Sequence, residues 1–434
     1  MQTYDLIQKT RRLIPLTEAE IRFLVEGFTA GEIPDEMMAA WLMAVCCQGL
    51  TEAETTALTL TMRDSGDCLD LSAIGAPTVD KHSTGGIGDK TTLICTPIAA
   101  ACGAHVAKMS GRGLGFTGGT IDKLESIPGF SVTMPQAQFL AQVRDIGCAV
   151  ISQSGHICPA DKKMYALRDR TATVDSIPLI CASILSKKLA LGADGILLDV
   201  KYGSGAFMKT PEQAVLLAET MVRVGTQAGR RVRAVITDMN APLGNCVGNA
   251  LEVEEAVQVL RGEAPGALCD LSCALAAQML TLSGMGDVVA CRQMAEEAVA
   301  SGAALEKLRA MIAAQGGDAS VCDDVRRLPQ AAEQMTVTAD RAGYVARIVS
   351  EEIGLACLGL GAGRASGLDA IDYGAGVRLH CAVGDAVNSG DPLFTVYGST
   401  PARCEAAAAR IRAAVSLTDT APAPIPMIHK IVDA

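Results

Sequence analysis

VDKHSTGGIGDKTT (residues 79–92) and AKMSGRGLGFTGGTIDKLES (residues 107–126) are two glycine-rich turns, each joining a β-like run to the start of a predicted helix. Glycine lets the backbone approach a ligand closely, and the N-terminus of a helix carries partial positive charge. Two such turns packed side by side would suit a small, doubly charged oxyanion. The pair therefore predicts a phosphate site and, with it, a phosphate-using enzyme.

Strand-like runs continue outward from these turns and alternate with Ala-rich helical stretches. The runs are TVDKHS, AHVAKMS, CAVISQS, GILLDVK and VRAVITDM. Their near-continuous hydrophobicity is typical of parallel strands that are covered on both faces. They predict an α/β domain with a mostly parallel sheet, made of residues 74–158 and 194–330.

Two helical segments flank and interrupt this α/β pattern. Residues 1–66 carry the capping-box sequence TEAE at Thr17 and again at Thr51. Residues 160–192 have the same helical character, so we expect one discontinuous helical domain, with hinges near 67–75, 153–160 and Gly192. The segment 34–48 is apolar nearly all round, which predicts deep burial or a subunit contact.

The last part of the chain, residues 335–434, changes to short strands such as GYVARIV, VRLHCAV and DPLFTVYG, followed by a Pro-rich tail expected to be extended. Residues 383–398 resemble the turn pattern of biotinyl and lipoyl carrier domains, which raises a carrier as a hypothesis of another class. A carrier needs a lysine at a hairpin tip, and the counterpart stretch 343–351 has none. We therefore predict a small β-rich, barrel-sandwich-like domain without an attached cofactor.

Composition narrows the function classes. The 434 residues are 49% hydrophobic but only 3% aromatic, and 37 Lys plus Arg against 48 Asp plus Glu give a net charge of −11. Such a chain is expected to form two or three domains and to bind neither nucleic acid nor an anionic membrane. The 16 cysteines form no Cys-x-x-Cys and the five histidines do not cluster with them. With no apolar signal segment and no run of transmembrane length, we expect reduced, buried thiols and a cytoplasmic protein.

The glycine turns do not match the common nucleotide motifs. In a P-loop a glycine would precede the Lys90-Thr91 pair, but Asp89 stands there and would repel a triphosphate. The dinucleotide fingerprint is not matched in register either. In the second turn, Arg112 is expected to pair structurally with Asp122 or Glu125, because a guanidinium between two carboxylates is already satisfied.

Besides the two glycine-rich turns, the helical segment that contains Arg168 offers a third candidate binding surface. Ser183 and Lys187 are four residues apart and share one face of a predicted helix, among apolar neighbours. Such a polar pair on a buried-looking surface can hydrogen-bond the edge of a planar, carbonyl-bearing ligand.

These segments, KHSTGGIGD, KMSGRGLG–TGGT and PADKKMYALRDRTATVDSIPL, resemble the pyrimidine-nucleoside phosphorylase and thymidine phosphorylase family. The resemblance extends to DVKYGSGAFMKT, TDMNAPLG and GNALEVEEAV, and so covers nearly the whole chain. It implies reversible phosphorolysis of a pyrimidine nucleoside to free base and pentose 1-phosphate, with His82, Arg168 and Lys187 as catalytic residues. The implied phosphate ligands are Lys81, Ser83, Thr92, Lys108, Ser110 and Thr120. The implied base ligands are His82, Arg168, Ser183 and Lys187.

The resemblance also carries expectations about partners. It implies a homodimer formed through the helical domain, inorganic phosphate as co-substrate and no organic cofactor. Broad-specificity members bind potassium beside the phosphate loop, and the matching positions here are Gly88, Lys90, Leu243, Cys246 and Glu255. Lys90 places an ammonium near that site, which leads to the hypothesis that it competes with the ion or replaces it.

The sequence also leads to an expectation about which nucleosides are substrates. The AKMSG and ALEVEEA segments look closer to the broad pyrimidine-nucleoside type, so we expect action on uridine, thymidine and deoxyuridine. A strict thymidine phosphorylase and a non-catalytic nucleoside- or phosphate-binding protein stay open as alternatives. The last is suggested by Phe116, which stands where relatives commonly carry His in GLGHTGGT.

Overall fold

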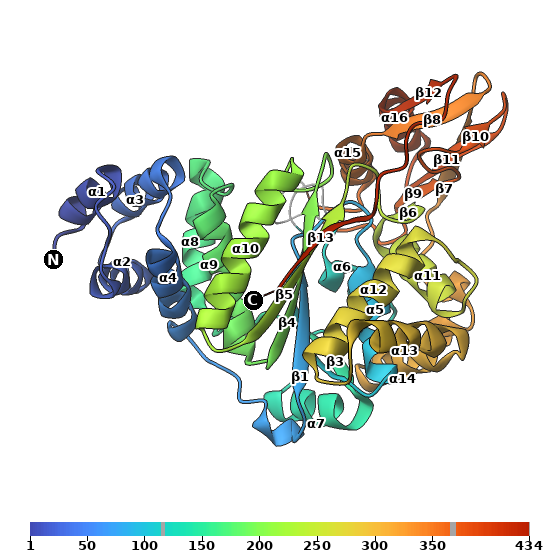
Figure 1. The fold of residues 1–434 in the computed structure, drawn as a ribbon. Helices are drawn as coiled ribbons and strands as arrows, with labels where there is room; N and C mark the ends of the chain where they lie inside the picture. Colours follow the sequence, from blue (N-terminus) through green and yellow to red (C-terminus); the bar gives the residue numbers. More distant parts are fainter. Residues whose placement is uncertain (114–117, 365–369, 434) are drawn as a thin grey trace.

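A computed structural model describes residues 1–113, 118–364 and 370–433 of the chain. Three layers of structure follow one another along the molecule: a helical bundle, a central sheet flanked by helices and a small β-rich part (Figure 1). The fold class predicted from the sequence is confirmed. Phe116 lies outside the described residues.

The helical bundle draws on two separate stretches of chain. Its helices are α1 (Thr3–Arg11), α2 (Glu18–Ala30), α3 (Asp35–Gln48), α4 (Glu52–Asp64), α8 (Pro159–Thr171) and α9 (Ile177–Leu191). Thr17 and Thr51 both form the predicted capping boxes. Trp41 of α3 is fully buried, and Met164 of α8 and Leu179 of α9 belong to the same apolar core. The bundle is therefore packed from two stretches of chain that are far apart in the sequence.

The central sheet has six strands in the order β13-β5-β4-β1-β2-β3. The five predicted strands are all present and parallel: β1 (Thr78–Ser83), β2 (His105–Ser110), β3 (Cys148–Ser152), β4 (Gly195–Tyr202) and β5 (Arg231–Asp238). Strand β4 is buried along its whole length, which explains its unbroken hydrophobic sequence. The sixth strand, β13 (Ile428–Val432), is antiparallel to β5.

Helices cover both faces of this sheet (Figure 1). On one face lie α5 (Thr91–Ala101), α11 (Asn249–Leu260), α12 (Ala267–Leu282), α13 (Val288–Ala300) and α14 (Ala303–Ala314). The other face packs against α9, α10 (Pro211–Gln227) and α7 (Gln136–Ile146), and the short α6 (Thr120–Glu125) follows the second glycine turn. Because β1 leads into α5 and β4 leads into α10, the connections leave to opposite faces, so β1 and β4 form a topological switch point.

The C-terminal part contains two small sheets, of order β10-β8-β12 and β6-β9-β11-β7. Its elements are β7 (Glu333–Thr338), β8 (Gly343–Ile348), α15 (Ser350–Leu360), β9 (Gly376–Leu379), β10 (Ala386–Val387), β11 (Pro392–Gly398), α16 (Pro401–Ala414) and β12 (Val415–Thr418). β6 (Cys246–Val247) comes from the central part of the chain and pairs with β9. The extended tail then returns as β13 to the central sheet, so the predicted unit 335–434 contributes strands to three sheets.

No helix among the described residues is long and apolar enough to span a bilayer. Most of the cysteines are buried, as the sequence predicts.

Candidate active site

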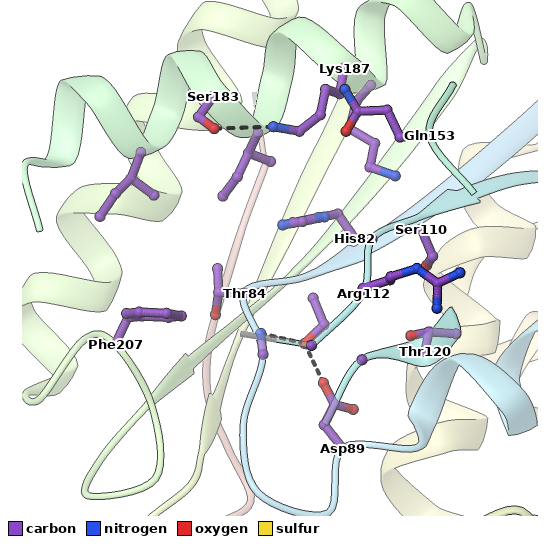
Figure 2. A pocket seen from close by; sticks show the side chains of 18 of the residues that line it. His82, Thr84, Asp89, Ser110, Arg112, Thr120, Gln153, Ser183, Lys187 and Phe207 are labelled. Carbon is purple, nitrogen blue, oxygen red and sulfur yellow. Dashed lines mark hydrogen bonds between the residues drawn. The ribbon is translucent and has the colours of Figure 1, made fainter. Parts of the chain in front are cut away.

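A cavity of about 290 Å³ lies at the carboxyl ends of β1, β2 and β4, between the sheet and helices α8 and α9. This is the topological switch point of the sheet, where open α/β folds bind their ligands. Figure 2 shows the two walls, with the α9 residues Ser183 and Lys187 facing the glycine loops across the cavity. Nine predicted site residues line it: His82, Ser83, Thr92, Lys108, Ser110, Thr120, Arg168, Ser183 and Lys187.

The phosphate wall is formed by the ends of β1 and β2 and by the starts of α5 and α6. The Ser83 hydroxyl donates to Asp89 and accepts a hydrogen bond from Gly85 N at 3.2 Å. The second carboxylate oxygen of Asp89 accepts from the Thr91 hydroxyl at 2.6 Å. Burial alone would raise the pKa of Asp89, but the nearby Lys201 and Lys81 hold it well below its ordinary value. The loop is thus held rigid by an ionised carboxylate.

Lys81 lies behind this wall, with none of its side chain exposed, and does not line the cavity. Its Nζ donates to Thr91 Oγ1 at 2.6 Å and lies 3.1 Å from Asp199 Oδ2. Burial would lower the pKa of Lys81, but Asp199 and Asp89 raise it above its ordinary value. Lys81 therefore contributes positive charge from beneath the loop.

Two further lysines converge on the buried Asp80. Lys188 Nζ donates to Asp80 Oδ2 at 2.7 Å and to the Met109 carbonyl at 2.7 Å. Lys108 Nζ lies 3.7 Å from Asp80 Oδ1 and donates to the same carbonyl at 3.1 Å. Burial, followed by the charge of Lys188, lowers the pKa of Lys108 to about 7. Two ammonium groups share one carboxylate, which leaves this corner of the cavity ready for an anion.

The low pKa of Lys108 leads to a prediction about pH. As pH rises through about 7, free Lys108 loses its positive charge, so kcat/KM for phosphate is expected to fall. A Lys108→Arg variant stays charged and is expected to lose this descending limb. The ionisation of phosphate acts in the opposite direction and is the same in both proteins. The measurement is a pair of pH profiles from about pH 6 to about pH 9; an unchanged descending limb in the variant would contradict the assignment.

His82, the next residue along β1 after Lys81, lies between the two walls of the cavity (Figure 2). Burial and the charges of four lysines, Lys188 and Lys108 foremost, lower the pKa of His82 well below its ordinary value. The imidazole is therefore neutral near pH 7, and it offers one N–H donor rather than a full positive charge.

The opposite wall is the polar pair on α9. Lys187 Nζ donates to Ser183 Oγ at 3.1 Å, which confirms that the two residues share one helix face. It also donates to Asp161 of α8, whose carboxylate is almost completely buried. The ion pair fixes the ammonium at the cavity surface.

Arg168 of α8 is buried and already binds backbone oxygens. Its Nε donates to Thr173 O at 3.1 Å, Nη1 to Leu179 O at 3.1 Å and Nη2 to Val174 O at 2.6 Å. A guanidinium has five N–H groups, so one on each terminal nitrogen is left for a ligand. The three carbonyls thus orient the guanidinium at the cavity wall.

Comparison with known proteins gives the same organisation. The family described as "Glycosyl transferase family, a/b domain" matches residues 75–305, its helical bundle domain matches residues 4–66, and "Pyrimidine nucleoside phosphorylase C-terminal domain" matches residues 344–418. The chain is 52% identical to a pyrimidine-nucleoside phosphorylase of Bacillus subtilis over 92% of both chains. The chain belongs to the pyrimidine-nucleoside phosphorylase family.

Other similar proteins agree with this placement within the pyrimidine-nucleoside phosphorylase family. A protein of that name from Staphylococcus aureus is 48% identical over 100% of both chains, and one from Geobacillus stearothermophilus is 50% identical over 92% of both. The crystal structure of an anthranilate phosphoribosyltransferase from Thermus thermophilus matches with a TM-score of 0.58 and 22% identity, covering 71% of this chain and 98% of that one. That match shows a shared fold.

The family resemblance did not single out every residue of the cavity. Asp89, Gln153, Tyr165, Lys188 and Phe207 also line it. Tyr165 could have been found from its spacing, since it precedes Arg168 by three residues on one helix face. Phe207 is about half exposed, which is unusual for so large an apolar side chain. Its loop follows β4, and only the fold brings that loop to the cavity.

Arg112 shows the predicted structural pairing. Its Nη1 lies 3.3 Å from Asp122 Oδ1, and its Nη2 donates to Glu125 Oε1 at 2.7 Å. Asp122 also accepts a hydrogen bond from Gly113 N at 2.7 Å. The start of the second glycine turn, at Arg112 and Gly113, is therefore anchored to α6.

Proposed function

We propose that this protein catalyses the reversible phosphorolysis of uridine, thymidine and deoxyuridine to free pyrimidine base and pentose 1-phosphate. The observation that carries the proposal is a cavity in which anion-binding loops face the polar pair Ser183 and Lys187 of α9. One wall suits an oxyanion, and the other suits the carbonyl edge of a base. A sugar that bridges them would present C1′ to the phosphate.

The phosphate wall supplies binding and orientation. A phosphate oxygen attacks C1′ as the C1′–N1 bond breaks, and the electron pair of that bond passes to the base. Phosphate is itself the nucleophile, so the reaction needs no activated serine or cysteine. Lys108 and Ser110, supported by Lys81 beneath the loop, hold the anion in place for this attack.

The helical wall stabilises the departing base, which carries negative charge until it takes up a proton. Lys187 and Arg168 donate hydrogen bonds to the ring edge as that charge develops, and Ser183 fixes the ring in plane. The neutral imidazole of His82 donates a hydrogen bond to a base carbonyl, and it keeps its proton throughout. Phe207, at the cavity wall, is placed to cover the planar ring.

Closure of the cleft would complete the site, because the two walls belong to different domains. One joining segment lies against the other, because Asp67 N donates to His156 O at 2.9 Å, and also against α9, because Leu69 N donates to Ala190 O at 2.8 Å. A hinge of this kind allows rotation without separation of the domains. Closing would exclude water, which otherwise competes with phosphate for C1′.

Self-association through the helical bundle is part of the proposal. Tyr4, Leu13, Ile14 and Met43 are large apolar side chains of the bundle region that remain exposed. Together they offer a surface for a second copy of this chain. Sedimentation velocity would test this: a dimer that dissociates in a Leu13→Glu variant supports the surface, and a monomeric wild type refutes it.

The decisive test is cleavage of uridine and thymidine by the purified protein, with and without inorganic phosphate, scoring free base and pentose 1-phosphate. Phosphate-dependent release from both nucleosides is the expected result. Release from thymidine alone would identify a strict thymidine phosphorylase. If neither nucleoside is cleaved but both bind, the protein is a nucleoside-binding protein.

A further inference from the structure

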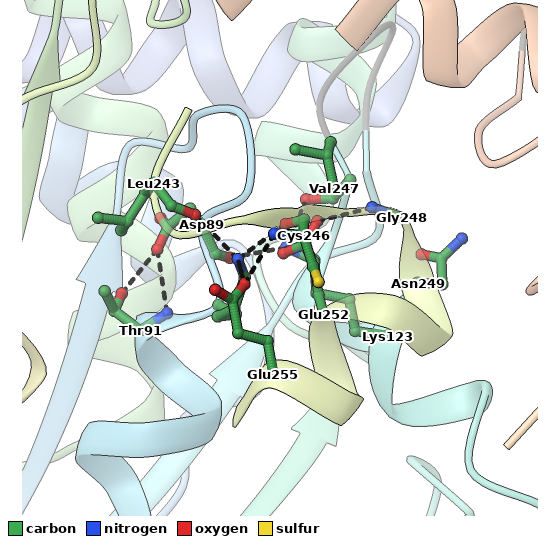
Figure 3. Close-up of polar contacts among 12 residues, drawn as sticks. Asp89, Thr91, Lys123, Leu243, Cys246, Val247, Gly248, Asn249, Glu252 and Glu255 are labelled. Carbon is green, nitrogen blue, oxygen red and sulfur yellow. Dashed lines mark hydrogen bonds and ion pairs between the residues drawn. The ribbon is translucent and has the colours of Figure 1, made fainter. Parts of the chain in front are cut away.

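The turn at residues 243–247 closes around the side chain of Lys90, behind the phosphate loop. Lys90 immediately precedes α5, and none of its side chain is exposed. Its Nζ donates to Leu243 O at 2.8 Å, to Cys246 O at 2.8 Å and to Glu255 Oε2 at 2.6 Å. Figure 3 shows Leu243, Cys246 and Glu255 converging on this point. All three donors of the ammonium are therefore used.

The surrounding backbone holds these oxygens in place. Glu255 also accepts hydrogen bonds from Asn245 N at 2.6 Å and from Cys246 N at 2.9 Å. Gly244 has φ +72°, and a Cβ there would lie 2.9 Å from Lys90 Nζ and 2.7 Å from Glu255 Oε1. Gly88, with φ +74°, leaves no room for a Cβ against the Leu243 carbonyl, at 2.6 Å. Two glycines with positive φ thus let the two loops close around one point.

Two carbonyls and a carboxylate form a donor set that suits a cation, since carbonyl oxygens can replace the hydration shell of potassium. The family resemblance places potassium at these residues. In this chain the residues do not fit the ion, because Lys90 Nζ already lies at hydrogen-bond distance from all three oxygens. The neighbouring carboxylate, Glu252, is paired with Lys123 at 2.8 Å. A second cation would have no counter-ion of its own here.

We propose that the ammonium of Lys90 is the permanent cation of this site, so that the protein needs no potassium there. A freely exchanging ion is replaced by one that is covalently attached to the chain. The inference concerns the loop itself, and it rests on the proposed function only where catalytic rates are used as a readout.

The position of Lys90 explains what this cation does. Asp89 and Thr92, on either side of it, line the cavity. The turn that it binds continues into β6, which pairs with β9 of the C-terminal part. Lys90 therefore connects the phosphate loop to the turn at residues 243–247 and, through β6, to the C-terminal sheet. It acts as a positioning residue.

The first test uses the wild-type protein. Its thermal unfolding temperature and its kcat/KM for phosphate are expected to be the same in KCl, NaCl and tetramethylammonium chloride at equal ionic strength. Crystals soaked in rubidium chloride are expected to show no anomalous peak among the oxygens of Leu243, Cys246 and Glu255. A saturable rise in unfolding temperature in KCl alone, or a rubidium peak there, would overturn the proposal.

Two variants of Lys90 provide the matched comparison. Lys90→Ser removes the ammonium and opens the space, so potassium is expected to bind there. In tetramethylammonium chloride the variant is expected to unfold at a lower temperature than the wild type, and its kcat/KM for phosphate is expected to fall about 10-fold or more. KCl is expected to reverse both effects. Lys90→Met fills the same space without charge and is expected to be destabilised in every salt. A folded Ser variant that responds to KCl no more than the Met variant would overturn the proposal.

These measurements distinguish failure of the cation-site proposal from failure of the proposed reaction. Unfolding temperatures and rubidium binding do not require a substrate, so they decide the cation site even if the protein cleaves no nucleoside. Should neither variant fold, the wild-type salt comparison still decides the question.

Discussion

Replacement of His82 by alanine is expected to lower kcat about 10²–10³-fold, the usual range for removing one hydrogen-bond donor aimed at developing charge. The ring lies between the phosphate loop and α9, and we expect its N–H to donate to the base as the glycosidic bond breaks. The KM for phosphate is expected to change little, because the anion-binding side chains stay in place. Steady-state kinetics with uridine or thymidine give both constants.

The low pKa of His82 sharpens this prediction. A neutral donor can be replaced by another neutral donor, so His82→Gln is expected to retain more activity than His82→Ala. His105→Ala is the matched control, since His105 begins β2 at the end of the sheet opposite the cavity. Equal loss in the Gln and Ala variants would count against hydrogen-bond donation by the imidazole.

Loss of Lys187 is expected to reduce kcat about 10²–10³-fold, because the departing base would lose a charged donor in a site shielded from water. Lys187→Met alone would leave the carboxylate of Asp161 buried without its cation, at a cost of about 3–5 kcal/mol in the free energy of unfolding. The test therefore uses the double variant Lys187→Met/Asp161→Asn, in which both charges are removed. Single-turnover rates with saturating phosphate measure the chemical step.

Lys163→Met is the matched control for that experiment. Lys163 lies on α8, as Asp161 does. Its ammonium lies 4.4 Å from the centre of the Phe28 ring, and the residue does not line the cavity. We expect it to keep wild-type rates. A folded double variant that retains more than about one tenth of the wild-type rate would exclude a charged role for Lys187.

Local pattern was sufficient for most of the fold. The β-branched runs predicted five parallel strands because strands covered on both faces need apolar residues at every position. Thr17 and Thr51 marked helix starts through side-chain capping, which depends only on neighbouring residues. The pairing of Arg112 with Asp122 and Glu125 spans 10 and 13 residues, but it stays within one turn and the helix that follows it. Such features follow from short-range geometry and so can be derived from the sequence.

The features of the site that the sequence did not predict depend on contacts between segments that are distant in the chain. Nothing in the sequence around Phe207 places it in the same cavity as Tyr165, because the loop after β4 and helix α8 are distant in the chain and line one cavity only after folding. The position of Lys81 beneath the loop, beside Asp199, depends on the register between β1 and β4, which no local pattern encodes. Its role as a phosphate ligand stays a prediction.

The return of β13 to the central sheet has a consequence for how the chain is made. Strand β5 ends at Asp238, but its outer edge is covered only by residues 428–432. At about 5–20 residues per second, a ribosome needs roughly 10–40 s to add the intervening chain. During that time the nascent sheet presents an open row of N–H and C=O groups, a template for wrong pairing. Chaperone demand during synthesis should therefore centre on this edge and end once residues 428–432 have paired with β5.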